Sequence, residues 1–273
     1  MGILSDPLSS QRLPLRHLYP ANWCDESFRT KLAYLTDHPE LCENGELLSA
    51  CGGKVVRKIE LPPSLGGGTV VHKLYRGKKP WRYVLDLSLP AREWRNYQAI
   101  YRLGLPAPRV LAYGEKRRLG VLESSFIVTE FISGTRDGCD FMPRGPRRGD
   151  VPMRRRFCEL IAPHLAALHR IGFFHKAFHP RNILYRGDTP ETMEVFFVDV
   201  ARCRIRPKRL MKFPILFDLY TPLRDLALPK EESLEFLAAY LKHSPGCPFD
   251  MAQLEKNLRA FRRHGEYFDV IGD

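Results

Sequence analysis

β-branched residues dominate two neighbouring stretches in the first half of the chain. Residues 54–61 (KVVRKIEL) and 69–76 (TVVHKLYR) are rich in valine and isoleucine, and two prolines and the triplet 66–68 (GGG) separate them. Runs of this kind, divided by turn residues, predict an antiparallel pair of strands. Residues 109–114 (RVLAYG) and 125–131 (SFIVTEF) have a similar composition. This region is therefore predicted to be mainly β-sheet.

Helical periodicity marks four other stretches. Apolar residues recur every three or four positions in residues 91–104 (AREWRNYQAIYRLG), and again in residues 157–172, 232–242 and 250–261. This spacing predicts amphipathic helices. Pro163 lies inside the second of them, and because an interior proline costs ~3 kcal/mol, we expect a kink or a restart there.

The order of these elements divides the chain into three parts. Residues 1–44 predict an irregular lead-in, and residues 45–133 a lobe of strands with one helix. Residues 134–273 predict a mostly helical lobe that contains one hairpin, formed by residues 183–186 and 194–200. The predicted fold class is α+β with two lobes.

Charge and composition limit the partners. The 273 residues include 43 Lys and Arg against 31 Asp and Glu, a formal charge of +12, and 44% of them are apolar. A chain with this apolar fraction can bury a hydrophobic core. Its positive charge favours anionic partners. A first basic tract, residues 136–156, is also rich in Gly and Pro and predicts a mobile connection or an insertion. Within it, Arg144–Arg156 predicts a solvated run of charge. A second tract is predicted to contact an anionic acceptor or membrane surface, because arginine suits phosphate groups. It consists of Arg202, Arg204, Arg206, Lys208 and Arg209.

Cysteine usage and hydropathy bear on the compartment. The seven cysteines show no C-x-x-C spacing, which favours free thiols in a reducing environment. The chain contains no apolar run of about 18 residues, and its start lacks the features of a signal peptide. We therefore expect a cytoplasmic protein without a transmembrane segment.

The stretch 175–182, HKAFHPRN, carries the strongest chemical signal. A histidine and an asparagine seven positions apart match the catalytic loop H-R-D-x-x-x-x-N of protein kinases, except that Ala177 stands where the catalytic Asp belongs. Asp199 follows Asn182 by 17 positions, at the end of the second hairpin strand. Asn182 and Asp199 are therefore predicted to hold one Mg²⁺ ion. For Asp199 alone, a turn residue at the end of a strand is the alternative.

Two further kinase elements precede this loop in the expected order. Lys73 lies in a strand at the position of the lysine that binds ATP phosphates, and Glu93 lies in the following helix, where it could hold Lys73. The alternatives are a solvent-facing lysine and a surface glutamate. Gly52 and Gly53 are the candidates for a phosphate-covering loop, but G-x-G-x-x-G is absent, so a simple turn is equally compatible.

Several segments together resemble the bacterial lipopolysaccharide kinase family of heptose and Kdo kinases. The similarity extends over roughly residues 47–242 and rests on VVHKLYRG, AREWRNYQAIYRLGLPAPRVLAYGE, SFIVTEFI, LHRIGFFHKAFHPRNILY and FFVDVARCR. It implies a bilobal protein-kinase-like fold that uses ATP and Mg²⁺ to phosphorylate a lipopolysaccharide-core sugar. It also implies roles for Lys73 and Glu93 at the nucleotide and for Asp199 at the metal. The acceptor would be an anionic glycolipid held at the inner membrane of a Gram-negative bacterium, which leaves peripheral membrane contact open.

Ala177 is the main departure from that family. His179, two positions further on, is a candidate substitute base, because histidine exchanges protons near neutral pH; a structural loop histidine is the alternative. Loss of the base also makes a pseudokinase a serious rival, one that binds nucleotide or a partner and regulates glycolipid synthesis without catalysis. Nucleic-acid binding is the weakest interpretation, since no RNP, helix-turn-helix or zinc motif accompanies the positive charge.

Overall fold

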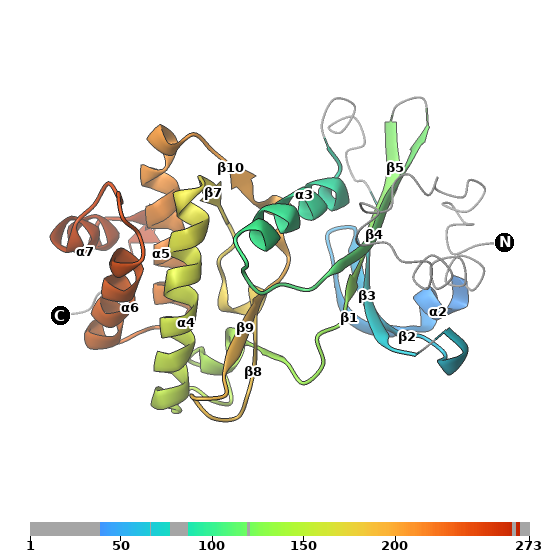
Figure 1. Cartoon of the computed structure of the whole chain (residues 1–273), viewed down its shortest axis with the longest axis horizontal. Helices are drawn as coiled ribbons and strands as arrows, with labels where there is room; N and C mark the ends of the chain where they lie inside the picture. The colour runs from blue at the N-terminus through green and yellow to red at the C-terminus, as the bar shows by residue number, and fades with distance from the viewer. Residues whose placement is uncertain (1–38, 66, 77–86, 119–120, 264–265, 268–273) are drawn as a thin grey trace. The chain divides into compact units, whose positions relative to one another are not determined.

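A computed structural model describes residues 39–65, 67–76, 87–118, 121–263 and 266–267 (Figure 1). Nearly all of the predicted lead-in lies outside the described residues. The chain divides into two compact units. The first contains residues up to 97 together with 108–132, and the second contains residues 98–107 and 133–273.

The first unit is built on a five-stranded antiparallel sheet with the strand order β1-β2-β3-β5-β4. Its strands are β1 Glu46–Cys51, β2 Lys54–Glu60, β3 Thr69–Arg76, β4 Val110–Arg118 and β5 Val121–Glu130, and the short helix α2 Pro39–Asn44 precedes them. The predicted pairing of β2 with β3 is confirmed. The sequence did not predict β1, because all six of its side chains are exposed at the sheet edge and leave no hydrophobic alternation.

Helix α3 (Leu89–Arg102) follows the predicted segment closely. The Ser88 hydroxyl accepts a hydrogen bond from the Ala91 amide at 3.3 Å and so begins the helix. The helix ends at Arg102, and Gly104 follows with a φ of +66°, the left-handed conformation that glycine adopts most easily. The Trp94 ring stacks on Tyr113 of β4 at 5.2 Å. This contact places the first turns of α3 on the sheet, where its Glu93 is fully buried.

The second unit is mostly helical. Its helices are α4 Val151–Arg170, α5 Lys212–Asp225, α6 Lys230–Lys242 and α7 Met251–Arg259. A three-stranded sheet of β6 Arg136–Asp137, β8 Ile183–Arg186 and β9 Glu194–Phe197 accompanies them, together with the pair β7 Phe173–Phe174 and β10 Arg204–Ile205. Within this unit, α4 runs alongside α6, and the β8–β9 hairpin matches its prediction (Figure 1).

Helix α4 provides the centre of the second core. Phe157, Ile161 and Leu165 are completely buried on one of its faces. The helix begins earlier than predicted, since the Asp150 carboxylate accepts a hydrogen bond from the Met153 amide at 3.3 Å. It is assigned as one continuous helix through Pro163, so the expected restart is wrong.

Helix α5 was missing from the sequence prediction, because prolines at positions 214 and 222 interrupt its apolar pattern. Pro214 lies in the first turn, where the backbone N–H has no intrahelical partner and its loss costs little. Pro222 lies in the last turn. Pro214 is therefore compatible with the helix, whereas Pro222 lies inside it and removes the hydrogen bond that an N–H there would donate to the Asp218 carbonyl oxygen. Helix α5 carries two residues of the candidate site, Asp218 and Asp225.

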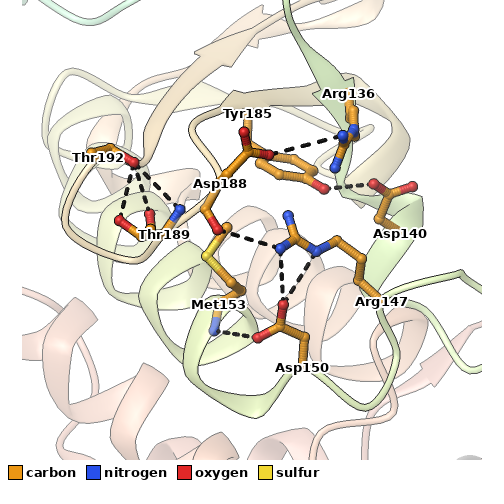
Figure 2. Close-up of polar contacts among 9 residues, drawn as sticks. All are labelled: Arg136, Asp140, Arg147, Asp150, Met153, Tyr185, Asp188, Thr189 and Thr192. Carbon is orange, nitrogen blue, oxygen red and sulfur yellow. Dashed lines mark hydrogen bonds and ion pairs between the residues drawn. The ribbon is translucent and has the colours of Figure 1, made fainter.

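The first basic tract is ordered, so its prediction as a mobile connection is wrong. It contains β6, the short 3₁₀ helix Gly138–Phe141 and the start of α4. Figure 2 shows Arg147 between the carboxylate of Asp150 at 3.2 Å and the carbonyl oxygen of Asp188 at 3.5 Å. The Tyr185 hydroxyl donates to Asp140 at 2.5 Å (Figure 2). These contacts fasten the tract to the β8–β9 hairpin.

One arginine of this tract is also part of the helical core. Arg154 donates to both carboxylate oxygens of Glu232 at 2.8 Å each, and the two side chains are only 11% and 7% exposed. The pair joins α4 to α6. The interpretation of the tract as solvated charge is therefore wrong for Arg154 and holds for exposed members such as Arg144.

Candidate active site

The first unit contains a buried ion pair between Lys73 and Glu93. Lys73 Nζ lies 2.6 Å from Glu93 Oε1, and the exposed fractions of the two side chains are 9% and 0%. Tyr75, two residues along β3 and therefore on the same face of the sheet, donates its hydroxyl to Glu93 Oε2 at 3.1 Å. Both oxygens of the buried carboxylate are thus satisfied, so the pair is held in one geometry.

This geometry decides between the alternatives left by the sequence. Lys73 is not a solvent-facing strand lysine, and Glu93 is not a surface glutamate. The neighbouring His72 is buried on the opposite face of β3 against Phe126, where burial and the nearby Arg57 lower its pKa to about 4. The strand is therefore covered on both faces at this point, and the lysine is directed onto α3 by the packing of the sheet.

Gly52 and Gly53 form the two-residue turn between β1 and β2. Cys51 pairs with Lys54 across this turn, and the two glycines have φ values of +60° and +89°. Positive φ at both central residues is the type I′ geometry of tight hairpins, which explains the Gly-Gly sequence. The turn requirement accounts for both glycines, and their contact with phosphate stays a prediction.

In the second unit, Asp218 fixes the backbone of the HKAFHPRN loop. Its carboxylate accepts hydrogen bonds from the amides of His175 at 2.7 Å and Lys176 at 2.8 Å. Lys176 has a φ of +62°, a conformation that is unfavourable for a lysine. Asp218 is completely buried in α5, and its two hydrogen bonds stabilise a loop conformation that would otherwise be unfavourable.

A second hydrogen bond chain orients this carboxylate. His169 Nε2 lies 3.2 Å from Asp218, and His169 Nδ1 lies 2.9 Å from the Tyr240 hydroxyl. Burial raises the pKa of Tyr240, so its hydroxyl stays protonated and can donate to Nδ1. His169 then presents its other N–H to Asp218. The chain links α4, α5 and α6 beneath the loop.

Asn182 and Asp199 lie at the same end of the β8–β9 hairpin. Ile183 pairs with Phe197, and the amide of Val198 donates to the Asn182 carbonyl oxygen at 3.0 Å. Asp199 follows directly, half-buried and with a φ of +58°. Such a conformation in a residue other than glycine often accompanies a functional site. That both side chains face one metal ion stays a prediction.

The side-chain chemistry at this end suits Mg²⁺. The Asn182 amide group donates to the Ala177 carbonyl oxygen at 2.8 Å, which leaves its own oxygen available as a ligand. An amide oxygen and a carboxylate are the hard oxygen ligands that Mg²⁺ accepts alongside phosphate and water. In the described part of the chain, no group of three His, Cys, Asp or Glu residues is placed to hold a metal.

The side chain of Ala177 has no acid or base, and that Ala177 occupies the position of the catalytic Asp stays a prediction; His179, two residues further on, has a carboxylate partner. His179 Nδ1 is 2.6 Å from Asp225 Oδ2, and the two side chains are 12% and 11% exposed. Although burial acts to raise the pKa of Asp225, hydrogen bonds from His179 and Arg224 hold it below the ordinary value of 3.8. Asp225 is therefore ionised at neutral pH and orients the imidazole.

His175 is different from His179. It is completely buried, and neither ring nitrogen has a hydrogen bond partner within the described residues. Burial outweighs the nearby Asp218 and Asp199 charges and lowers its pKa to about 4. Its ring packs edge-on against Phe178 at 5.2 Å. This histidine therefore packs the loop and is too enclosed to exchange protons with a substrate.

The second basic tract follows Asp199 and is exposed over most of its length. Arg202, Arg206, Lys208 and Arg209 are exposed, and Arg204 is half-buried in β10. Arg206 lies over the Phe174 ring at 5.8 Å. The structure thus leaves this tract accessible to an anionic partner, whereas the first tract is largely used within the fold.

Two residues of the site were not found from the sequence. Asp218 stands alone in an apolar helical run, which is an available signal, since an isolated carboxylate among buried residues needs a partner. Asp225 carries no such signal. Its contact with His179 joins positions 46 residues apart and depends on the packing of α5.

A β-sheet unit with a buried Lys–Glu pair, and a helical unit with an Asp-anchored loop, define a kinase-like phosphotransferase fold. The family model described as the lipopolysaccharide kinase (Kdo/WaaP) family matches residues 65–240. That is more than half of the chain, and the protein belongs to this family.

The curated relatives that match this chain share one protein name. A lipopolysaccharide core heptose(I) kinase, WaaP, of Pseudomonas aeruginosa is 28% identical over 216 residues, which cover 72% of this chain and 80% of that protein. The WaaP of Escherichia coli K12 is 25% identical over 228 residues, 76% of this chain and 83% of that protein. Among solved structures, one titled WaaP in complex with acyl carrier protein matches with a TM-score of 0.59 at 20% identity. The match covers 86% of this chain and 91% of that chain. This likeness confirms the predicted kinase-like fold.

Proposed function

We propose that the protein transfers the γ-phosphoryl group of ATP to a hydroxyl of a lipopolysaccharide-core sugar, heptose or Kdo. The observation that carries this proposal is the buried Lys73–Glu93 ion pair in a chain of this family. A lysine fixed by a glutamate is the group that kinases use to position ATP phosphates. The names of the curated relatives support a heptose of the core as the acceptor.

The proposed roles divide between nucleotide, metal and acceptor. Lys73 contacts the phosphates, Glu93 keeps Lys73 in place, and the Gly52–Gly53 turn covers the phosphates with backbone N–H groups. Asn182 and Asp199 would hold Mg²⁺, which when bound neutralises charge on the phosphate oxygens. Phosphoryl transfer passes through a loose transition state, so correct positioning contributes more to the rate than a strong base.

His179 is proposed to accept the proton of the acceptor hydroxyl. If Nδ1–H donates to Asp225, the lone pair of Nε2 is free, and the carboxylate stabilises the imidazolium that forms. Asp225 thus acts as a positioning residue for His179. Because the base is provided by a different side chain, Ala177 is compatible with catalysis.

The second candidate is a pseudokinase that binds nucleotide or a partner and regulates envelope glycolipid synthesis. The observation that favours it is Ala177, whose carbonyl oxygen accepts a hydrogen bond from the Asn182 side chain and whose methyl group can neither donate nor accept a proton. In that case the His179–Asp225 pair only fixes the loop.

The partner and compartment follow from the same proposal. Arg202, Arg204, Arg206, Lys208 and Arg209 contact the anionic part of the glycolipid acceptor, because guanidinium groups pair with phosphates in two-point contacts. The protein works in the cytoplasm or at the inner face of the cytoplasmic membrane. No helix within the described residues is long and apolar enough to span a bilayer.

The test measures binding and transfer separately. Calorimetry with ATP and Mg²⁺ reports nucleotide binding, and mass spectrometry of purified core glycan reports phosphate transfer. We expect both for the wild type and neither for Lys73→Met. The control Lys58→Met removes a lysine of the same sheet whose carboxylate partners, Glu46 and Glu60, are both exposed, and it should keep both activities. ATP binding without transfer would favour the pseudokinase, and no ATP binding would contradict the nucleotide site.

A further inference from the structure

Exposed apolar side chains gather on one surface of the second unit. Among the described residues of this unit, five large hydrophobic side chains are exposed, and four of them are Ile171 at 37%, Ile205 at 50%, Leu210 at 52% and Phe213 at 57%. The fifth is Val151, at the other end of α4. Isolated exposed side chains are ordinary, but a group of four is not.

The backbone holds these side chains together. β10 pairs with β7, with Ile205 opposite Phe173, and the Phe213 ring lies edge-on to Phe174 at 6.4 Å. The Arg206 amide donates to the Gly172 carbonyl oxygen at 2.7 Å, which brings the segment after Ile171 onto the same surface. A side chain at position 172 would meet the Arg206 carbonyl oxygen at 2.1 Å, so glycine is required for this approach. The β7–β10 pair, the end of α4 and the start of α5 lie together at the top of this unit in Figure 1.

A basic residue adjoins each of the four apolar residues along the chain. Residues 200–217 contain no Asp or Glu. No ion pair with another described residue engages Arg206, Lys208, Arg209 or Lys212. The exposed basic residues of this surface are Arg170, Arg202, Arg206, Lys208, Arg209 and Lys212. Together with Ile171, Ile205, Leu210 and Phe213 they form what we call the apolar–basic patch.

We infer that the apolar–basic patch docks the protein on an anionic lipid bilayer, with the four apolar side chains entering the interface and the six basic residues contacting lipid phosphates. Cations between single protruding apolar side chains suit the interfacial zone, where each side chain enters lipid separately while its charged neighbours stay at the headgroups. A standard protein–protein interface buries about 800 Å² on each partner, and its centre is depleted of charged residues, whereas charged and apolar residues alternate along this patch.

This inference deepens the proposed function, and rests on it only for the consequence that a lipid-linked acceptor is met at the membrane. Arg202 lies three residues after Asp199, so the patch begins beside the proposed metal ligand. Bilayer binding itself requires no catalysis. Lys73→Met should therefore abolish phosphate transfer and leave vesicle binding unchanged, which separates failure of one proposal from failure of the other.

The experiment is flotation of the full chain with vesicles of phosphatidylcholine alone, or of phosphatidylcholine mixed with phosphatidylglycerol. We expect binding to the mixed vesicles that salt weakens. Each basic residue close to an anionic surface strengthens binding about fivefold. The variant Lys208→Gln/Arg209→Gln/Lys212→Gln should therefore bind on the order of 100-fold more weakly. The control Lys230→Gln/Lys242→Gln/Lys256→Gln removes the same charge from exposed positions elsewhere in this unit and should bind like the wild type.

The apolar contribution is tested with Ile205→Ser/Leu210→Ser, two exposed positions whose change leaves the core intact. We expect at least tenfold weaker binding to the mixed vesicles at unchanged thermal stability. The control Leu47→Ser/Leu48→Ser alters equally exposed residues of β1 and should have no effect. Absence of binding to mixed vesicles, or equal binding by all variants, would overturn the inference. If the wild type binds a purified acidic carrier protein but no vesicles, and the patch variants lose that binding, the patch belongs to a protein partner instead.

Discussion

His179 Nδ1 lies 2.6 Å from Asp225 Oδ2, across 46 residues of sequence. The contact orients a loop histidine two residues after Ala177, the position that we predict to correspond to the catalytic aspartate of kinases. If the pair provides the base, His179→Ala should lower the rate of phosphate transfer about 10²-fold or more, the usual contribution of a general base. Asp225→Asn should lower it less and change its pH profile. Calorimetry should show unchanged ATP binding for both. His243→Ala, at an exposed histidine, is the control.

Restoring the missing carboxylate tests the other assignment of the loop. Ala177→Asp should raise the rate of phosphate transfer ~10² to 10⁴-fold if His179 contributes little, because position 177 then regains the proton acceptor. Single-turnover kinetics with a core glycan would measure this. Ala177→Asn has nearly the same shape without the basicity and should leave the rate low. An unchanged rate in Ala177→Asp, with His179→Ala inactive, would assign the base to His179.

The Lys73–Glu93 pair predicts opposite effects on stability and function. Lys73→Met leaves a buried carboxylate without its counter-charge, and we expect a loss of about 3 kcal/mol in the free energy of unfolding. Lys73→Met/Glu93→Gln should recover most of that loss, because the uncompensated charge is gone, but should not recover ATP binding. Urea unfolding and calorimetry give the two readings. A double variant as unstable as the single one would show that packing, and not charge, sets the cost.

Asp218 is expected to control the stability of the loop. Asp218→Asn replaces one accepting oxygen by an N–H₂ group that faces backbone N–H donors, so we expect a loss of about 2–4 kcal/mol. Thermal unfolding measures it, and hydrogen exchange at the amides of His175 and Lys176 should become faster. Asp250→Asn keeps a capping residue at the start of α7 and should change stability by less than about 0.5 kcal/mol. Equal stability of both variants would contradict this role.

Two buried histidines predict an acid-labile fold. The pKa values of His72 and His175 are lowered from 6.5 to about 4 by burial. Between these pH values the unfolded chain binds more protons than the folded chain, so stability is highest above pH 6.5 and falls as the pH drops towards 4. Each histidine contributes at most about 3 kcal/mol to this loss in the free energy of unfolding. Urea unfolding from pH 7 to 4.5 should show the fall, and His72→Phe, which keeps the stacking on Phe126, should reduce it. Stability that does not vary with pH would contradict the prediction.

The sequence predicted those features that depend on order along the chain. Lys73 and Glu93 could be paired because a strand lysine followed by a helix glutamate is a recognisable succession, and their 2.6 Å contact followed. The Asp218 and Asp225 contacts could not be predicted, because α5 was hidden by its prolines and its carboxylates reach a loop more than 40 residues earlier. The ordered first basic tract was missed for a related reason, since Arg154 finds its partner on α6.

The Arg154–Glu232 pair also constrains how the second unit forms during synthesis. Arg154 is enclosed within the helical core, yet its carboxylate partner Glu232 is 78 residues further along the chain. Until residue 232 has left the ribosome, α4 would have to bury a guanidinium without its counter-charge, which is costly. Helix α4 therefore completes its packing only when α6 arrives. A nascent chain halted before residue 230 should remain sensitive to protease, whereas one extended past residue 260 should become resistant.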